Sequence, residues 1–175
     1  MIIIKNDLPY FEVLLYYRVR ERWLELSNFT IISSKAGHVY LSDGSVITAR
    51  VIIVDIIEGE IKPVGPDFQV GLQIAFSVKA PEELRKRIRD KPLPPSDGSH
   101  LRNLEIWDIV RIIKKSNAVE ECLYKASDGR TYKICVEVEV AIVARTLEYR
   151  DRNYNPIYHL RWIPCIRVNI AENEV

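Results

Sequence analysis

The sequence predicts a mainly β protein, a β-barrel or β-sandwich, with one short helix near residues 81–90. Isoleucine and valine together number 40, against 24 for leucine, alanine and methionine, and β-branched side chains fit a pleated sheet better than a helix. Apolar residues recur at every second position in several segments, as in strands with one buried face. Ser-Asp-Gly occurs at 42–44 and 127–129, each time between two such segments, where a hairpin needs a tight turn.

Residues 10–23 fit two periodicities. Alternating apolar residues at 11, 13, 15, 17 and 19 suit a strand, whereas Phe11, Leu15, Val19 and Trp23 recur at the spacing of four typical of a helix. The strand is preferred because valine, tyrosine, phenylalanine and tryptophan are concentrated here. Both alternatives stay open at this stage.

Residues 38–58 are predicted to form a hairpin around the first Ser-Asp-Gly turn. Its second strand, from Val46 to Glu58, carries apolar residues on both faces, so we expect it at the centre of a sheet. The most regular alternation follows at residues 68–79, and it predicts a strand with one face on the core.

The predicted helix at 81–90 has favourable ends. Pro81 suits a first turn, acidic residues follow it, and basic residues at 85–89 suit the C-terminal end of the helix dipole. Leu84 and Ile88 form a narrow apolar stripe. The proline-rich residues 91–100 have the composition of a linker, so we expect two β-units, residues 1–90 and 101–175.

The second unit is predicted to repeat the hairpin. Residues 121–125 lead into the second Ser-Asp-Gly turn, and a long alternating strand follows from Tyr132 to Ile142. The last strand, residues 160–170, contains Pro164, which cannot donate to a ladder, so we expect an edge strand or a bulge there. A free edge is where another chain can add a strand.

The two halves also match in order along the sequence, which indicates an internal duplication. Residues 24–26 resemble 104–106, residues 31–32 resemble 112–113, the two Ser-Asp-Gly turns correspond, and Leu72 is matched with Leu160. The offset grows along the chain, as longer loops in the second copy would cause. Unrelated hairpins also share this turn, so duplication and coincidence both stay open.

Composition disfavours several classes of protein. The 25 lysines and arginines balance 24 acidic residues, and neither half is strongly basic, which argues against an extended nucleic-acid surface. No apolar run is long enough for a membrane helix, and we expect no signal peptide. Cys122, Cys135 and Cys165 form no Cys-x-x-Cys pair, so we expect a reducing, cytoplasmic setting. Few glutamines and one methionine also fit a thermophile.

The sequence carries no catalytic signature, neither a Gly-x-Ser-x-Gly elbow nor a glycine-rich phosphate loop. Glu137 and Glu139 share a strand face, as a glycosidase or metal site would require, but neighbouring acids on a solvated face are commoner. The three histidines are isolated from one another. We therefore predict no metal and no cofactor.

Asp55 stands inside the apolar run of residues 51–57, and two interpretations follow. A buried carboxylate would need a partner or a proton, and Arg50 or Arg111 would supply the partner. The favoured alternative is that the strand reaches solvent near residue 58 and leaves Asp55 hydrated.

For function, the sequence favours a non-catalytic binding or assembly module that acts through protein–protein contacts, including self-association into a homo-oligomer. The second hypothesis is a protein that binds single-stranded nucleic acid through arginine and aromatic side chains. Its candidate residues are Tyr16, Arg18, Arg20, Arg22, Trp107, Arg111, Arg161 and Trp162. The third is a small-molecule binder or enzyme with a site between the two halves.

Overall fold

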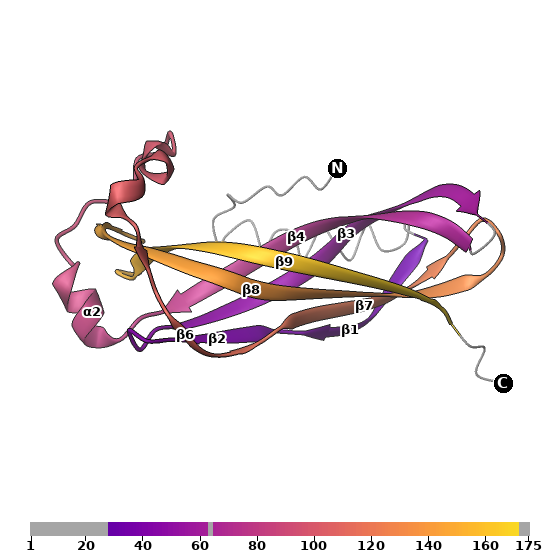
Figure 1. Ribbon diagram of the computed structural model, residues 1–175, viewed down its shortest axis with the longest axis horizontal. Helices are drawn as coiled ribbons and strands as arrows, with labels where there is room; N and C mark the ends of the chain where they lie inside the picture. Colours follow the sequence, from indigo (N-terminus) through magenta and orange to yellow (C-terminus); the bar gives the residue numbers. More distant parts are fainter. Residues whose placement is uncertain (1–27, 63–64, 172–175) are drawn as a thin grey trace.

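The computed structural model describes residues 28–62 and 65–171, and within them the protein is a sandwich of two antiparallel sheets (Figure 1). The strands are β1 (Phe29–Lys35), β2 (Gly37–Leu41), β3 (Val46–Lys62), β4 (Gly65–Lys79), β5 (Asp108–Ile109), β6 (Ile112–Ser116), β7 (Ala118–Lys125), β8 (Thr131–Arg150) and β9 (Pro156–Ile170). Helix α2 (Glu82–Arg87) and the 3₁₀ turns η1 (Ser99–Arg102) and η2 (Leu104–Ile106) lie between β4 and β5. The predicted mainly β fold is confirmed, as a sandwich and not a closed barrel. The question of residues 10–23 lies outside the described residues.

Five strands form sheet A, in the order β1-β7-β8-β5 with β9 also paired to β8, and four form sheet B, in the order β4-β3-β2-β6. Each sheet therefore contains strands from both halves of the chain. Residues 91–100 run past the end of β8, where the Arg150 amide donates to the carbonyl oxygen of Pro92 at 3.0 Å. No described helix is both long and apolar enough to cross a membrane.

Two bent strands connect the sheets. Residues 29–41 pair with residues 112–125 almost throughout, first as β1 with β7 in sheet A and then as β2 with β6 in sheet B. At the crossing, a Cβ on Gly37 would lie 2.5 Å from the Ala118 nitrogen and 2.7 Å from the Ser116 oxygen. Only glycine permits this approach, because backbone atoms on both strands leave no room for a side chain.

The two halves repeat the same hairpin. Tyr40 pairs with Val46 and Lys125 pairs with Thr131, which are equivalent positions relative to the two Ser-Asp-Gly turns. Gly44 and Gly129 adopt φ of 82° and 81°, the left-handed conformation that these turns require. Each half adds a third strand, β4 or β9, to its hairpin, so the halves agree in strand order as a duplication requires.

One sequence match is wrong. Leu72 lies opposite Ile53, and the equivalent position in the second half is opposite Val138, where Pro164 lies. Leu160 pairs instead with Val143, because the connection between β8 and β9 is longer than the one between β3 and β4.

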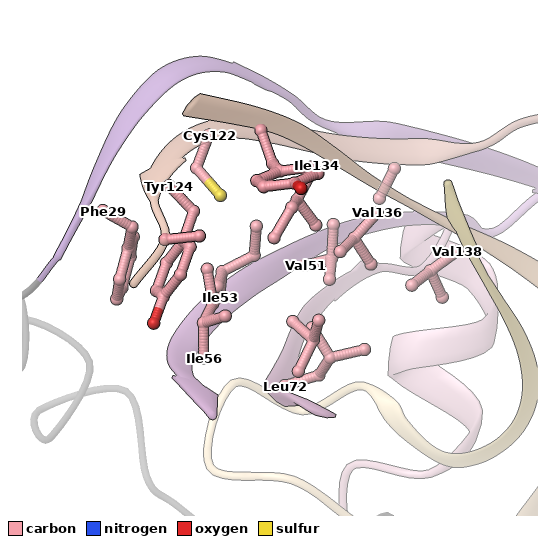
Figure 2. Close-up of a cluster of buried hydrophobic side chains, with 14 of the residues drawn as sticks. Phe29, Val51, Ile53, Ile56, Leu72, Cys122, Tyr124, Ile134, Val136 and Val138 are labelled. Carbon is pink, nitrogen blue, oxygen red and sulfur yellow. The ribbon is translucent and has the colours of Figure 1, made fainter. Parts of the chain in front are cut away.

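The larger core cluster fills the space between the sheets (Figure 2). Val51, Ile53 and Leu72 of sheet B face Ile134, Val136 and Val138 of sheet A. Glu120 is also buried here, and its Oε2 accepts a hydrogen bond from the Ile53 amide at 2.5 Å. Strand β2 pairs with β3 only as far as Gly37 and Ala49, so it cannot accept from the Ile53 amide. The Glu120 carboxylate accepts from that amide instead.

Burial of both faces of β3, expected from the sequence, holds only for Val51, Ile52 and Ile53. The register with β4 shifts between Ile53 and Asp55. Val54, at this bulge, is 37 % exposed, and Ile57, beyond it, is 56 % exposed.

Gly37→Ala is expected to lower the free energy of unfolding by about 3 kcal/mol, because the new Cβ meets backbone that moves only if the strands shift. Gly129→Ala is the control: its Cβ would meet nothing within 4 Å, and it carries only the strain of a left-handed φ, about 1 kcal/mol. Urea unfolding followed by circular dichroism measures both. Equal losses would contradict the close crossing at Gly37.

Candidate interaction surface

Strand β9 forms one margin of sheet A. It pairs with β8 from Ile170 to Pro156, and within the described residues no strand pairs with its other edge. Of the two alternatives that Pro164 indicates, an edge strand or a bulge, the structure shows the edge strand. An edge strand presents a row of unpaired amides and carbonyls, which is a template for another strand.

The apolar side chains of β9 that face the interior are poorly covered. Ile166, Val168 and Ile170 pair with Val136, Ile134 and Tyr132, which are all buried. Yet Ile166 and Val168 are each 38 % exposed and Ile170 is 55 % exposed. Sheet B therefore covers the neighbouring strand but not this row.

Sheet B ends on the same side of the sandwich. Its margin is β4, and the ring of Phe76 lies 5.7 Å from that of Trp162 on β9. Nearer the other end of β4, Phe68 packs edge-to-face on Tyr132, the residue opposite Ile170. We call Phe76, Ile166, Val168 and Ile170 the open side, because the two sheet margins meet here without hydrogen bonding to each other among the described residues.

The outer face of sheet A is polar. Glu137 accepts from Asn117 at 2.8 Å and pairs with Arg167 at 3.0 Å, and these contacts hold the pKa of Glu137 below its ordinary value. Glu139 pairs with Lys115. Each acid has its own cation on a solvated face, so the arrangement does not resemble a pair of carboxylates that share a proton.

Of the nucleic-acid candidates, the four within the described residues do not all share one face. Tyr16, Arg18, Arg20 and Arg22 lie outside the described residues. Trp162 packs against both core clusters, while its neighbour Arg161 is exposed, because successive strand residues point to opposite faces. Arg111 is also exposed, in the segment between β5 and β6.

Trp107 lies in a cluster of aromatic and histidine rings, and the sequence does not predict that these rings come together. Its indole Nε1 donates to the His100 carbonyl at 3.1 Å, and its ring lies 6.0 Å from that of His159 on β9. His100 also contacts Tyr149 on β8, with ring centroids 5.6 Å apart. Arg161 follows His159 two positions along β9, so an exposed cation adjoins these rings.

Asp55 is exposed, so the interpretation as a buried carboxylate paired with Arg50 or Arg111 is wrong. The bulge at Val54 turns the strand at this point, and the Asp55 carboxylate accepts from the Ile56 amide at 2.9 Å. An exposed carboxylate keeps its hydration and needs no cation.

The buried polar cluster lies instead at the first Ser-Asp-Gly turn. Tyr158 donates to Asp43 at 2.7 Å, Arg145 donates to the same oxygen at 2.8 Å, and the Ser45 and Tyr158 hydroxyls are 2.7 Å apart. Burial raises the pKa of Tyr158, and the hydrogen bond to Asp43 adds to the rise. Burial would also raise the pKa of Asp43, but hydrogen bonds from Tyr158, Ser45 and Arg145 outweigh it and hold that pKa below its ordinary value. The cluster joins the first turn to β8 and β9.

The second turn is joined to the first half in a similar way. Ser127 donates from its amide to Glu58 at 3.0 Å and lies 2.6 Å from the same carboxylate through its hydroxyl. Each Ser-Asp-Gly turn is thus hydrogen-bonded to a strand of the other half. The sequence reveals the turns but not these partners, because the partners are distant along the chain.

The cysteines are free, and only Cys165, on β9, is exposed. Burial, with Glu120 nearby, raises the pKa of Cys122 to about 12, so this thiol stays protonated at neutral pH and is a poor nucleophile. Within the part of the chain that the structure describes, no cluster of three or more histidine, cysteine or acidic residues is arranged to hold a metal.

No family model, curated protein or solved structure matches this chain.

Asp43→Asn is expected to lower the free energy of unfolding at neutral pH by about 1–2 kcal/mol, because the amide loses charge-assisted hydrogen bonds from Arg145 and Tyr158. A folded-state pKa below the ordinary 3.8 means that this stabilisation is complete above 3.8 and is lost as the pH falls through the folded-state value. Wild type and variant should therefore converge in acid.

The control is Asp97→Asn, whose carboxylate accepts from the Ser99 amide at 2.9 Å within its own exposed turn. It should change stability far less than Asp43→Asn. Thermal and urea unfolding across the acid range measure both variants. A gap between wild type and Asp43→Asn that stays constant down to the acid limit would contradict the role of the carboxylate charge.

Proposed function

We propose that this protein is a non-catalytic binding or assembly module that acts through protein–protein interaction, self-association included, at the open side. The observation that carries the proposal is the row Ile166, Val168 and Ile170, which faces the interior and is nevertheless 38–55 % exposed. Exposed apolar rows beside unpaired strand edges are the usual signature of strand addition, in which main-chain hydrogen bonds give affinity and alternate side chains give specificity.

A second copy is the partner that the strand suits best. An antiparallel pair of β9 strands related by a twofold axis at Arg167 would bring Ile166 of one copy opposite Val168 of the other. Arg167 already pairs with Glu137 on its own chain, which reduces the repulsion between two arginines at the axis. Pro164 blocks ladder hydrogen bonding further along, so the pairing is confined to the last few residues of β9. A cytoplasmic location, where Cys165 stays reduced, is part of this proposal.

Val168→Lys is expected to abolish self-association, because burying an ammonium group in an apolar interface without a partner is strongly unfavourable. Size-exclusion chromatography with light scattering should give a mass above 20.3 kDa for the wild-type chain and 20.3 kDa for the variant. Asn169→Lys, on the opposite face of the same strand, is the matched control and should still associate. A wild type that is monomeric at every concentration, or a Val168→Lys variant that still associates, would contradict self-association at the open side.

Single-stranded nucleic-acid binding is the second candidate, and the contact between Trp107 and His159 beside exposed Arg161 favours it. Bases stack on aromatic rings, and arginine contacts phosphate. The proposed surface lies at the start of β9, away from the open side.

Arg161→Ala is expected to weaken binding of a fluorescent oligonucleotide and to reduce the slope of log affinity against log salt by about 0.7, the value for one phosphate contact. Arg130→Ala, which removes an exposed arginine from the second Ser-Asp-Gly turn, is the control and should keep the wild-type slope. Affinity that is independent of salt, or of Arg161, would exclude this surface.

A further inference from the structure

The outer face of sheet B carries a basic surface at the end of the sandwich next to α2 (Figure 1). One row of residues crosses all four strands there: Lys79 of β4, Val46 of β3, Tyr40 of β2 and Lys114 of β6. Residues opposite one another in a sheet point to the same face, and Ile47, the next residue along β3, is fully buried. The row therefore faces outward, where Tyr40 and both lysines are exposed.

The next row of this face consists of small polar side chains: Ser77, Thr48, His38 and Ser116. The Thr48 hydroxyl lies 3.3 Å from Nδ1 of His38, and the Ser116 hydroxyl accepts from the His38 amide at 3.0 Å. One step further along β3, Arg50 is exposed and stands opposite Ala75 of β4. Cations and one aromatic ring therefore surround a row of hydroxyl groups on this face.

No acidic side chain lies among these cations. Neither row contains an aspartate or a glutamate, and no described acid forms an ion pair with either lysine or with Arg50. Asp43, in the adjoining turn, is bonded to Arg145. Glu82, at the start of α2, pairs with Lys86. The described part of the chain thus leaves this positive charge without a counter-charge, and the surface complements an anionic partner.

We propose that this surface binds single-stranded nucleic acid through Tyr40, Arg50, Lys79 and Lys114, which we call the basic face. Proteins hold single strands by cations that follow the phosphate backbone and by aromatic rings on which bases stack. Tyr40 lies between the two lysines, whose strands are three spacings of about 4.8 Å apart, about 14 Å in all. A base on the Tyr40 ring thus has a cation on either side for its flanking phosphates, and the hydroxyl row supplies hydrogen bonds to phosphate oxygens.

Two other anionic partners fit the basic face less well. A bilayer is bound by apolar side chains that enter it, and this row offers only Tyr40 and the partly buried Val46. An acidic peptide would pair with the cations and leave the Tyr40 ring without a stacking partner. The proposal shares its ligand class with the second candidate function but none of its residues, so either surface can be excluded without the other.

Fluorescence anisotropy of a labelled oligothymidylate, titrated with the full chain at several salt concentrations, tests the proposal. Replacing both lysines, as Lys79→Ala with Lys114→Ala, should reduce the slope of log affinity against log salt by about 1.4, which is about 0.7 for each phosphate contact. Lys133→Ala is the matched control, because this lysine pairs with Glu121 on the outer face of sheet A at 3.2 Å. It should keep the wild-type slope.

Tyr40→Ala should weaken binding about tenfold and leave the salt slope unchanged, because a stacked base is lost but no phosphate contact. Tyr40→Phe keeps the ring and should bind as wild type does. Tyr40 and both lysines are exposed, so the variants should keep the wild-type fold, which circular dichroism checks.

The proposal is overturned if the wild-type chain does not bind oligothymidylate, or if the Tyr40→Ala and lysine variants bind it as wild type does. Loss of binding in Arg161→Ala alone would place the strand at the start of β9 instead. Equal competition by polyglutamate, with no effect of Tyr40→Ala, would indicate an acidic protein. Binding to phosphatidylserine vesicles but not to oligothymidylate would indicate a membrane. Each of these results contradicts the basic face as a nucleic-acid site.

Discussion

The pairing of residues 29–41 with residues 112–125 is the contact on which the rest of the structure depends. Both strands pass from one sheet to the other at the same level, where Gly37 lies against the backbone of residues 116–118. The two sheets are therefore one ribbon of strands folded over at this crossing. The ribbon has two ends, β4 and β9, and folding brings them to the same side, where Phe76 and Trp162 touch. The open side is a direct consequence of this topology.

Polar contacts hold the folded ribbon together where apolar packing is thin. The first Ser-Asp-Gly turn is bonded through Asp43 to Tyr158 and Arg145, and the second is bonded through Ser127 to Glu58. In both cases the partner belongs to the other half of the chain, so neither half keeps its turn fully hydrogen-bonded alone. Buried Glu120 plays a similar part for the Ile53 amide. Such groups are costly to leave unpaired, which makes the two halves interdependent in stability despite their similar architecture.

Local features of the fold follow from the sequence, and long-range features do not. Alternation and turn chemistry predict both hairpins and β4, and Pro81 with the charges that follow it predicts the short helix. Pro164 indicates an edge strand or a bulge, and β9 is an edge strand. The sequence does not reveal where the strands cross from one sheet to the other. Alternation shows that one face of a strand is buried, but not which sheet covers that face. Ile166 and Val168 have the same pattern as Ile134 and Val136, yet only the latter pair is covered. Asp55 allowed two interpretations for a related reason: a bulge changes the face of a strand without changing its composition. The favoured one, a hydrated carboxylate, is correct.

Two apolar surfaces thus lie outside the core, and they differ in a way that bears on function. Ile52, on the outer face of sheet B, is 4 % exposed, and Gly71, Gln73 and Ala75 on the neighbouring strand are half-buried. The row on β9 is exposed beside an unpaired edge, which in a permanently monomeric protein would favour aggregation. Edge strands are commonly protected by charges, prolines or bulges. Strand β9 has such protection at Pro164, whereas over Ile166–Ile170 its one charged side chain, Arg167, is paired with Glu137 on its own chain. An edge that is blocked in its middle and free at its end is better suited to one short, specific pairing than to indefinite association.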